Sequence, residues 1–440
     1  MRCSKLFIFI LLAIGFACSN NDQETSTPQL EVTSESAVKP DSTLQIEVTV
    51  VAPGLLTSDV ITGELVSGEG ELAKTNFVGG NMGTGNATFD FTAGSTENSR
   101  ALLRFRAMDL AGQEGSSEIE IEITSLEFKR VLVINEGNFF SANGSLDVFD
   151  IASNQIEHGV FPANATIQQV SMHEEMVYLV TNAPDRLDIL NDQFESVASV
   201  DEGLDNPIDF AAIGNTGYIS NWGDINTAFT DNPDSYVAII DLESYQVTDS
   251  ILLDDRPENL LVYDDKVYVA LEGGSSVAVI DPATLVMDEI TVPAGPSNMV
   301  VDDLGMIWVL CTSGSLVEID PSTASTGVSI DGLTTAGYRE KLSIDGTGHY
   351  LYFLAGGNDS FTGLTKVYKV DLRSQQVDPI IKDGVALYGL GVNPESGHVY
   401  LGDSNAFQST GTAFIYNSGG NKLDEFATGI GPKGFLFMRN

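Results

Sequence analysis

The feature that most constrains the fold is an internal repeat of about 45 residues, which runs from Phe128 to the C-terminus. One element recurs as "RVLVIN", "MVYLVTN", "TGYISNW", "KVYVALE", "MIWVLCT", "YLYFLAG" and "HVYLGDS". A second follows as "GSLDVFD", "DRLDIL", "SYVAIID", "SSVAVID", "GSLVEID", "TKVYKVD" and "TAFIYN". From Leu132 to Tyr400 the central residues of the first element are 46, 40, 50, 40, 44 and 48 residues apart. Several short strands at this period are typical of a β-propeller, so seven copies predict seven blades.

A third repeated element stands before the "RVLVIN"-type element in later copies of the repeat. It is missing from the first copy. It reads "NPIDFAAI", "RPENLLVY" and "GPSNMVVD" within the chain, and "GPKGFLFM", Gly431 to Met438, at the C-terminus. We expect this C-terminal strand to complete the first blade as its innermost strand. Closing the ring in this way removes the free edges of an open sheet.

Residues 29–125 carry a different pattern, with segments such as "LQIEVTVV", "NATFDFTAG" and "SEIEIEIT". In the last of these, Ile and Glu alternate, which indicates a strand with one buried and one solvated face. About seven such strands in roughly a hundred residues predict an immunoglobulin-like sandwich. The overall prediction is an all-β chain, with a sandwich at 29–125 and a seven-bladed propeller at 126–440.

The N-terminus predicts export. Arg2 and Lys5 precede an apolar run, Leu6 to Phe16, which is too short to span a membrane and has the layout of a signal peptide over residues 1–17. The ending "AIGFAC" resembles the lipobox of bacterial lipoproteins, which implies lipidation of Cys18; an ordinary signal with a chance cysteine is the alternative. Residues 18–28 then form a flexible tether. The "SNNDQE" that follows the cysteine resembles a surface-export tag, which implies a cell-surface protein anchored by lipid to the outer membrane.

Charge and cysteine content narrow the partners. The formal net charge is −41, which makes nucleic acid a poor partner and leaves the lipid as the means of membrane attachment. Once Cys3 is removed with the signal and Cys18 is lipidated, only Cys311 remains, so no intramolecular disulfide is expected. Cys311 lies in the apolar run "MIWVLC" and is interpreted as a buried core residue.

The connections of the repeats are unequal. Those between the second and third strands of a blade include "NEGNFFSANG", "SNWGDINTAFTDNPDS", "AGGNDSFTGLT" and "GDSNAFQSTGT", whereas the turns on the other face are short. We call the face with the long connections the loop face. Its connections carry aromatic residues among amides and glycines: Phe139, Phe140, Trp222, Phe229, Phe361 and Phe407. Such rings and amides are typical of binding surfaces. The alternative is that the rings cap the edges of the blades.

The starts of the innermost strands are expected to line the mouth of a central channel, with Asn206 among them. Together with the loop face they give these predicted ligand-binding residues: Asn135, Glu136, Asn138, Phe139, Phe140, Asn182, Asn221, Trp222, Arg256, Asn259, Asn298, Arg339, Tyr388, Asn405, Phe407 and Lys433. The cations in this set suit an anionic or amide-rich ligand. The alternative is that they pair with the neighbouring acids Asp254, Asp255, Glu258 or Glu340.

The sequence offers no catalytic constellation. The histidines, His158, His173, His349 and His398, are scattered, and three lie in or beside the short turns. No HxxxH or CxxC spacing, phosphate loop or nucleophile elbow is found, so neither a transition metal nor a cofactor is expected. In "TDNPDSY", Asp231 and Asp234 offer oxygens to Ca²⁺ without the full spacing of a calcium loop.

The units of the type "VYVAL…SSVAVIDPAT" resemble the YncE-like, surface-layer-type seven-bladed propellers over residues 128–440. The phrase "NEGN…GSL", Asn135 to Leu146, resembles more particularly a subfamily of outer-membrane lipoproteins, some of which capture corrinoids over a TonB-dependent transporter. This resemblance implies a non-enzymatic protein that binds a nutrient or a transporter through its loop face. The alternatives are a lactonase-like hydrolase or lyase, with a channel metal held by acids such as Asp209 and Glu258, and an adhesive or scaffolding protein.

Overall fold

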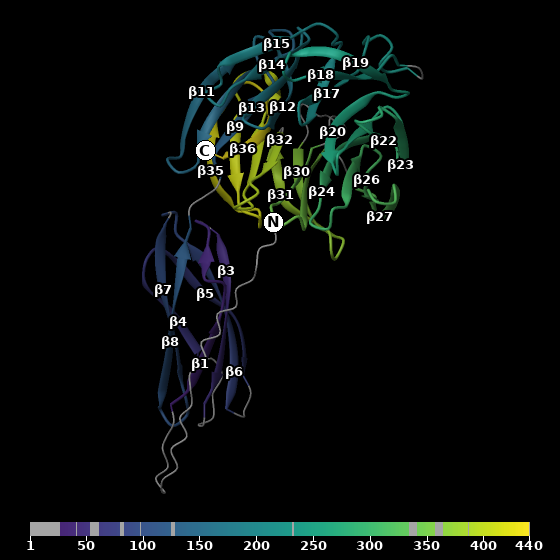
Figure 1. Cartoon of the computed structure of the whole chain (residues 1–440). Coiled ribbons are helices and arrows are strands. Elements are labelled where there is room, and N and C mark those ends of the chain that lie inside the picture. Colours follow the sequence, from purple (N-terminus) through teal and green to yellow (C-terminus); the bar gives the residue numbers. More distant parts are fainter. Residues whose placement is uncertain are drawn as a thin grey trace. The chain divides into compact units, whose positions relative to one another are not determined.

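The structure is a computed structural model that describes residues 27–40, 42–52, 61–79, 83–96, 98–124, 128–230, 233–333, 341–356, 364–385 and 387–439. The predicted signal peptide, Cys18, Asp231, Arg339, Glu340 and Phe361 lie outside the described residues. The chain divides into two compact units, Met1–Ser125 and Leu126–Asn440, each of which is described by itself (Figure 1). No helix in the described ranges is both long and apolar enough to cross a membrane.

The N-terminal unit consists of two four-stranded sheets. One has the order β1 (Gln29–Thr33), β3 (Thr43–Val51), β6 (Thr84–Ala93), β5 (Gly70–Gly79), and the other β2 (Ala37–Val38), β8 (Glu114–Ile123), β7 (Ser99–Met108), β4 (Ile61–Ser67). Both sheets contribute to one core, in which Phe89 of β6 and Phe105 of β7 meet edge to face with centroids 5.0 Å apart. In β8, Ile121 and Ile123 are buried and Glu122 between them is exposed, so the predicted alternation is confirmed.

The second unit contains five four-stranded sheets and one of eight strands. The five are antiparallel meanders in chain order: β12 (Thr166–His173), β13 (Met176–Asn182), β14 (Arg186–Leu190), β15 (Ser196–Val200); β16 (Pro207–Ile213), β17 (Thr216–Asn221), β18 (Tyr236–Asp241), β19 (Gln246–Leu252); β20 (Pro257–Tyr263), β21 (Lys266–Leu271), β22 (Ser276–Ile280), β23 (Met287–Thr291); β24 (Pro296–Val301), β25 (Ile307–Cys311), β26 (Ser315–Asp320), β27 (Ser325–Asp331); and β28 (Leu342–Ile344), β29 (Tyr350–Gly356), β30 (Leu364–Asp371), β31 (Gln376–Val385).

The eight-stranded sheet joins the two ends of the unit. Its order is β11 (Gln155–Pro162), β10 (Ser145–Asp150), β9 (Phe128–Asn135), β36 (Pro432–Arg439), β32 (Leu387–Val392), β33 (Val399–Asp403), β34 (Thr412–Tyr416), β35 (Lys422–Ala427). The C-terminal β36 is antiparallel to β9, from Pro432 beside Asn135 to Arg439 beside Phe128. The predicted pairing of the C-terminal segment with the first strand is therefore confirmed.

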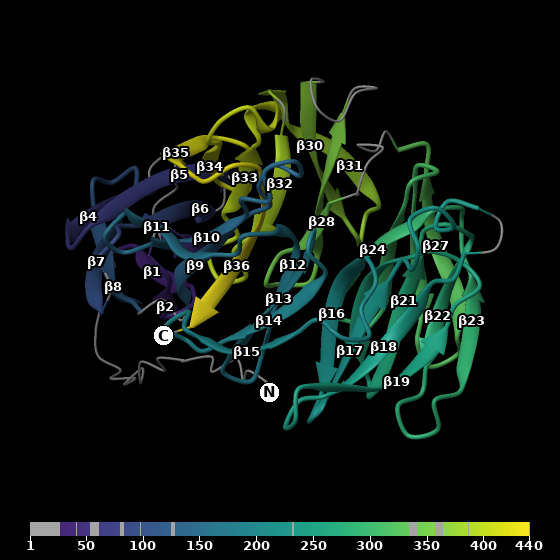
Figure 2. The same cartoon turned by 90° about the horizontal axis from the view of Figure 1, so that it is seen from above.

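A single parallel bridge, Leu390 with Gly434, fuses the two halves of this sheet. The close approach needs residues without side chains, because a Cβ added at Gly389 would lie 2.5 Å from the carbonyl oxygen of Pro432. From sheet to sheet, the innermost strands contact one another in the order β12, β16, β20, β24, β28, β32, β36. This order gives the β-propeller arrangement of Figure 2. A short 3-10 helix, η1 (Asn405–Phe407), lies between β33 and β34.

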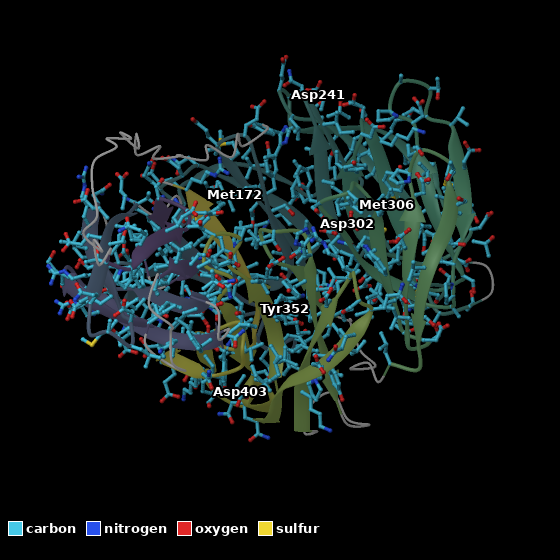
Figure 3. The ribbon with its side chains drawn as sticks, turned by 90° about the horizontal axis from the view of Figure 1, so that it is seen from below. Met172, Asp241, Asp302, Met306, Tyr352 and Asp403 are labelled. Carbon is cyan, nitrogen blue, oxygen red and sulfur yellow. The ribbon has the colours of Figure 1, made fainter. Side chains whose placement is uncertain are left out.

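The repeat in the sequence is explained by core packing. The residues at its centre are no more than 3% exposed: Leu132, Tyr178, Tyr218, Tyr268, Trp308, Tyr352 and Tyr400. Tyr400 packs between the two halves of the eight-stranded sheet, and the others pack between neighbouring sheets. Tyr352, which is labelled in Figure 3, packs with residues of its own sheet and with Val392 and Val399 of the next. A large ring at this position fills the wedge-shaped space between twisted sheets, so a ring recurs in six of the seven copies, while the first copy has Leu132.

Candidate functional site

The innermost strands surround a cavity of about 280 Å³. Residues of β12, β16, β20, β24, β32 and β36 line it, together with Ile134 of β9 and the segment Lys341–Ser343 at β28. The polar part of its lining consists of Gln168, Gln169, Asp209, Glu258, Asn259, Asn298, Lys341, Ser343 and Lys433. This central cavity is mixed in charge, with carboxylates and ammonium groups on the same wall.

A repeated β-bulge directs these side chains. The register of the innermost strand against its neighbour slips just after its first residues in β12, β16, β20, β24, β32 and β36. A bulge inserts an extra residue and re-aims its side chain, which here places consecutive residues such as Glu258 and Asn259 on the cavity wall. Gln168 and Lys433 lie at the same point of β12 and β36 and are 5% and 4% exposed.

Asp209 of β16 is the most deeply buried acid of the cavity. Its carboxylate accepts hydrogen bonds from the backbone N–H of Phe210 (2.8 Å) and Leu260 (2.8 Å), and from Nδ2 of Asn259 (2.7 Å). Desolvation raises its pKa to about 6, although these three donors oppose the shift and the nearby Glu258 adds to it. Asp209 therefore titrates in a mildly acidic range, and it also ties β16 to β20.

The predicted ligand residues Asn259 and Asn298 repeat this structural role. Asn259 accepts the N–H of Met299 at 3.0 Å, and Asn298 accepts that of Leu342 at 3.4 Å. Each amide thus links its strand to the next strand around the cavity. Both line the cavity and are half-buried, so they combine the tie with a place on the wall.

A cluster of Glu136, Tyr388 and Lys433 connects the loop face with the cavity. Glu136 is the first residue after β9, and its Oε2 lies 3.3 Å from Nζ of Lys433 and accepts a hydrogen bond from the hydroxyl of Tyr388. Lys433 also donates to the carbonyl of Ile167 at 3.3 Å. The structure therefore brings together three predicted site residues from three separate parts of the chain.

A second predicted group forms around Arg256. Its guanidinium lies 5.0 Å from the centroid of Trp222 and 4.2 Å from that of Phe229, and it pairs with Glu272. Trp222 meets Phe229 edge to face at 5.5 Å and donates Nε1 to the carbonyl of Pro257 at 2.8 Å. These contacts hold Arg256 against two rings. Trp222 is half-buried under this stack, whereas Phe229 is 64% exposed.

Three further loop aromatics, Phe139, Phe140 and Phe407, lie at the junction of the first and last repeats. Phe407 meets Tyr388 edge to face at 5.0 Å, and its carbonyl accepts Nδ2 of Asn138 at 3.3 Å. Phe139 and Phe140 pack on each other at 5.9 Å and are 60% and 94% exposed. These two rings present apolar surface to solvent.

Three predicted amides are not available to a surface ligand. Asn135, Asn182 and Asn221 end the second strands of their sheets and are 0%, 8% and 0% exposed. Asn182 accepts Nε2 of Gln168 (2.7 Å), and Asn221 accepts the N–H of Asp205 (3.0 Å) and donates to Ile219. None of the three is among the residues that line the central cavity. Only Asn221 bonds the backbone, whereas Asn182 bonds a side chain and Nδ2 of Asn135 lies 3.4 Å from the hydroxyl of Ser145.

Two other residues from the sequence analysis, Asn405 and Asn206, make local contacts. Asn405 is exposed on η1 and bonds locally to Asp403 and Ser409. Asn206 donates to Asp205 and to the carbonyl of Gly223, so it fixes a connection.

The sequence reasoning missed Lys341 and Gln168. Lys341 precedes Asp345 by four residues, as Asn298 precedes Asp302, so counting back from the turn would have found it. The segment before it lacks the Pro-x-Asn pattern of the preceding copies, which concealed the equivalence.

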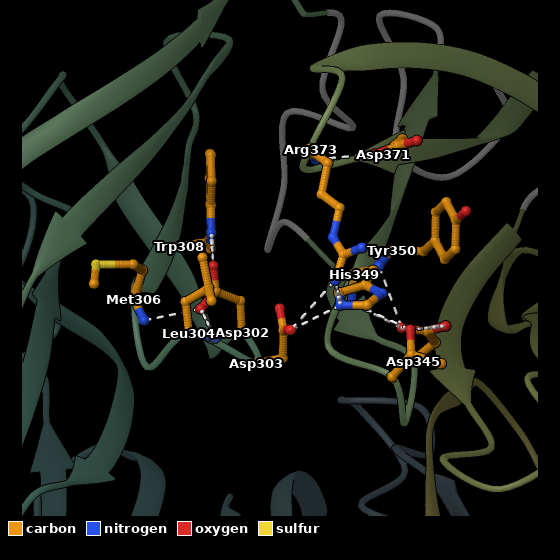
Figure 4. Close-up of polar contacts among 11 residues, drawn as sticks. Asp302, Asp303, Leu304, Met306, Trp308, Asp345, His349, Tyr350, Asp371 and Arg373 are labelled. Carbon is orange, nitrogen blue, oxygen red and sulfur yellow. Dashed lines mark hydrogen bonds and ion pairs between the residues drawn. The ribbon is translucent and has the colours of Figure 1, made fainter. Parts of the chain in front are cut away.

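Outside the cavity, a polar group lies on the short turns opposite the loop face (Figure 4). Nε2 of His349 is 2.7 Å from Oδ2 of Asp303, and Arg373 contacts both. Trp308 donates Nε1 to Asp302 at 2.9 Å. These contacts tie the turn of β24–β25 to that of β28–β29. Within the described ranges, no three or more His, Cys, Asp or Glu side chains are arranged to hold a metal ion.

The sequence model of a protein family described as Domain of unknown function (DUF5074) matches residues 129–428, more than half of the chain. The chain belongs to this family. No curated protein matched the sequence.

Two solved structures show the fold of this family member. A quinonprotein alcohol dehydrogenase-like protein from Bacteroides thetaiotaomicron is similar over 91% of this chain and 96% of its own, with 15% identity and a TM-score of 0.53. Hydrazine synthase from Kuenenia stuttgartiensis is similar over 61% of this chain and 88% of its own, with 13% identity and a TM-score of 0.50. The similarity to the Bacteroides thetaiotaomicron protein covers 91% of this chain, which is more than Leu126–Asn440 makes up. This similarity therefore extends into the N-terminal unit. At these identities the likeness is one of fold.

Proposed function

We propose that this protein is a lipid-anchored surface protein that binds a ligand, without catalysis, at the loop face of a seven-bladed propeller. The observation that carries the proposal is the junction at Glu136. This residue begins a long loop with exposed phenylalanines and at the same time contacts Lys433 on the cavity wall. Loop surface and central cavity thus belong to one continuous feature, as is common for binding sites on rigid scaffolds.

The seven-bladed ring and the immunoglobulin-like identity of the N-terminal unit are parts of this proposal. Seven innermost strands line or adjoin the central cavity, and each has three partner strands outside it. The N-terminal unit has two sheets around one core, as a sandwich requires. We assign it the role of a spacer between the anchor at Cys18 and the propeller.

For the ligand, the exposed rings favour a large molecule with apolar surface. Phe140 and Phe229 are 94% and 64% exposed, and rigid rings give contact area at low entropic cost. A corrinoid passed on to a TonB-dependent transporter, as the resemblance of Asn135 to Leu146 to a subfamily of outer-membrane lipoproteins implies, fits this requirement. A lactonase-like enzyme would instead need a metal held by Asp209 and Glu258.

The test is titration calorimetry of the protein with cobinamide and cobalamin. The double variant Phe140→Ser, Phe229→Ser is expected to raise Kd at least tenfold. Leu304→Ser is the matched control, because Leu304 is 75% exposed on a turn of the opposite face. Absence of heat at micromolar protein would overturn the corrinoid assignment, and an equal effect of the control would overturn the loop face. A stoichiometric divalent ion in purified protein would overturn the non-enzymatic reading.

A further inference from the structure

We propose that the central cavity binds an uncharged cyclic polyol, a molecule of the size of one monosaccharide ring. The inference rests on the proposed function in that it names the ligand chemistry of the inner part of the same site. It depends on the charges and hydrogen bonds of the cavity wall and on the volume that the wall encloses.

The charged side chains of the wall do not call for a charged ligand. The lining contains two carboxylates, of Asp209 and Glu258, and two ammonium groups, of Lys341 and Lys433. The carboxylate of Asp209 already accepts three hydrogen bonds from neutral donors, and Nζ of Lys433 lies 3.3 Å from a carboxylate oxygen of Glu136. A ligand of either charge therefore meets like charges as well as opposite ones, and it loses its hydration on entry.

The asparagine amides of the wall are held in place and have hydrogen-bonding capacity left. A primary amide has two N–H protons and an oxygen with two lone pairs. Among the described residues, Asn259 uses one proton on Asp209 (2.7 Å) and one lone pair on a backbone N–H of β24 (3.0 Å). Asn298 uses one proton on the carbonyl of Ser297 (2.9 Å) and one lone pair on a backbone N–H of β28 (3.4 Å). Each amide thus has a donor and an acceptor for a ligand, at a position fixed by two bonds.

Gln169 and Ser343 add donors to the same wall. Oε1 of Gln169 accepts the N–H of Val170 at 3.1 Å, and Oγ of Ser343 accepts that of Val392 at 3.2 Å. In the described part of the chain no contact engages the amide nitrogen of Gln169 or the hydroxyl proton of Ser343. A hydroxyl group both donates and accepts, so a ligand with several hydroxyls matches a wall on which donors and acceptors are mixed.

The apolar part of the wall favours a ring over an open-chain polyol. Leu390 and Val392 of β32 and Phe435 and Phe437 of β36 line the cavity. A cyclic polyol carries hydroxyls at its rim and C–H groups on its faces, so it makes polar and apolar contacts at the same time. Because a ring is rigid, it also loses less conformational entropy on binding than an open chain does. A purely apolar ligand would leave the amides without water or a partner, which is unfavourable.

The volume limits the ligand to a single ring. A water molecule occupies about 30 Å³ in the liquid, so a cavity of about 280 Å³ holds roughly nine water molecules. Covalently bonded atoms pack more closely than separate water molecules, so one six-membered ring with its hydroxyls fits this space, whereas a disaccharide does not. We use glucose as the probe. Glucuronate and 6-amino-6-deoxyglucose are its charged analogues, and maltose is the larger one.

The experiment measures Kd of the full folded protein for these four sugars by titration calorimetry at pH 7.5. We expect glucose to bind at least fivefold more tightly than either charged analogue and at least tenfold more tightly than maltose. Gln169→Leu should raise Kd for glucose at least fivefold, since it removes a wall amide whose described hydrogen bond stays within β12. Gln246→Leu, at an exposed position on the outermost strand β19, is the matched control and should leave Kd unchanged.

Two variants test the charge argument directly. Lys341→Gln leaves the carboxylates of the lining in excess, so Kd for 6-amino-6-deoxyglucose is expected to fall at least threefold while that for glucose stays within twofold. Glu258→Gln leaves the ammonium groups in excess and should lower Kd for glucuronate in the same way.

The outcomes are decisive and separate from those for the loop face. Tighter binding of a charged sugar than of glucose by the wild type, equal binding of maltose, no heat with any of the four sugars, or an unchanged Kd for glucose in Gln169→Leu would each overturn the polyol. If cobinamide still binds and loses affinity in the Phe140→Ser, Phe229→Ser variant, the proposed function stands although the polyol fails. If glucose binds as expected and cobinamide does not bind, the polyol stands and the corrinoid assignment fails.

Discussion

The closure of the propeller by its last strand makes a quantitative prediction for Met438. This residue is the third from last in the sequence, yet it is 1% exposed and packs in a core cluster with Leu132 and Val170. Truncation to alanine removes its buried methylene and methyl groups and leaves a cavity, for which buried Met→Ala changes give about 2–5 kcal/mol of destabilisation. We expect Met438→Ala to lower the free energy of unfolding by about 3 kcal/mol.

The assay is urea denaturation followed by tryptophan fluorescence. Both tryptophans of the chain, Trp222 and Trp308, belong to the second unit, so the signal reports the propeller without a contribution from the N-terminal unit. With a slope of about 3 kcal/mol per molar urea, the midpoint is expected to fall by about 1 M at an unchanged slope.

The control is Arg439→Ala, the next residue, which is exposed and stacks on Phe128 at 5.2 Å. It is expected to change stability by less than about 1 kcal/mol. If Met438→Ala were as stable as the wild type, or if both variants lost the same amount, the C-terminal strand would not be packed against β9. The reasoning about closure would then be refuted.

Three further predictions concern the cavity wall, the seam and the core. Because burial raises the pKa of Asp209 from 3.8 to about 6, the native state binds this proton more tightly than the unfolded chain does. The contribution of Asp209 to the free energy of unfolding should therefore fall by about 3 kcal/mol as pH rises from about 4 to about 6. The difference in free energy of unfolding between wild type and Asp209→Asn, measured by urea denaturation, should show this slope, and a difference independent of pH would contradict it. Gly389→Ala brings a Cβ to 2.5 Å from the Pro432 carbonyl and should destabilise by about 1–3 kcal/mol, whereas Gly419→Ala, whose nearest contact is at 3.4 Å, should be nearly neutral in the same assay. Burial raises the pKa of Cys311 to about 12. In a variant with Cys3 and Cys18 replaced by Ser, iodoacetamide at pH 8 should therefore modify Cys311 only in denaturant. Rapid labelling of the folded protein would show instead that the thiol is accessible.

The sequence predicted those parts of the fold that depend on periodic burial. The large central residue of each copy, such as Tyr268, recurs because the same space between sheets must be filled each time, and its position was readable from spacing alone. The pairing of β36 with β9 was readable for a similar reason, since the first copy lacks an innermost strand and the C-terminus supplies one.

The candidate site was only partly predictable, because side-chain direction at the end of a strand cannot be read from composition. Asn135 and Asn138 are three residues apart and chemically identical, yet Asn135 is fully buried while Asn138 reaches across to Phe407. One residue more or less in a strand turns a side chain to the other face, and the β-bulges of the innermost strands make this shift at the positions that line the cavity. Lys341 was missed for another reason, because the segment before it lacks the Pro-x-Asn pattern of the preceding copies.

The dual use of the cavity-lining residues has a consequence for how the site evolves and how it should be probed. From β16 to β28, consecutive strands are tied by side chains of Asp209, Asn259 and Asn298, whereas at β32 and β36 the backbones pair directly across Gly389 and Gly434. From β16 to β28, the side chains that link neighbouring strands are thus the same side chains that form the polar wall of the cavity. At β32 and β36, the link between strands is made by the backbone and is separate from the polar wall. Substitutions at Asp209 or Asn259 must change stability together with any binding, while Lys341 and Glu258 can change the charge of the wall without breaking one of these three ties. The charges that choose a ligand are therefore expected to vary most freely at the latter two positions.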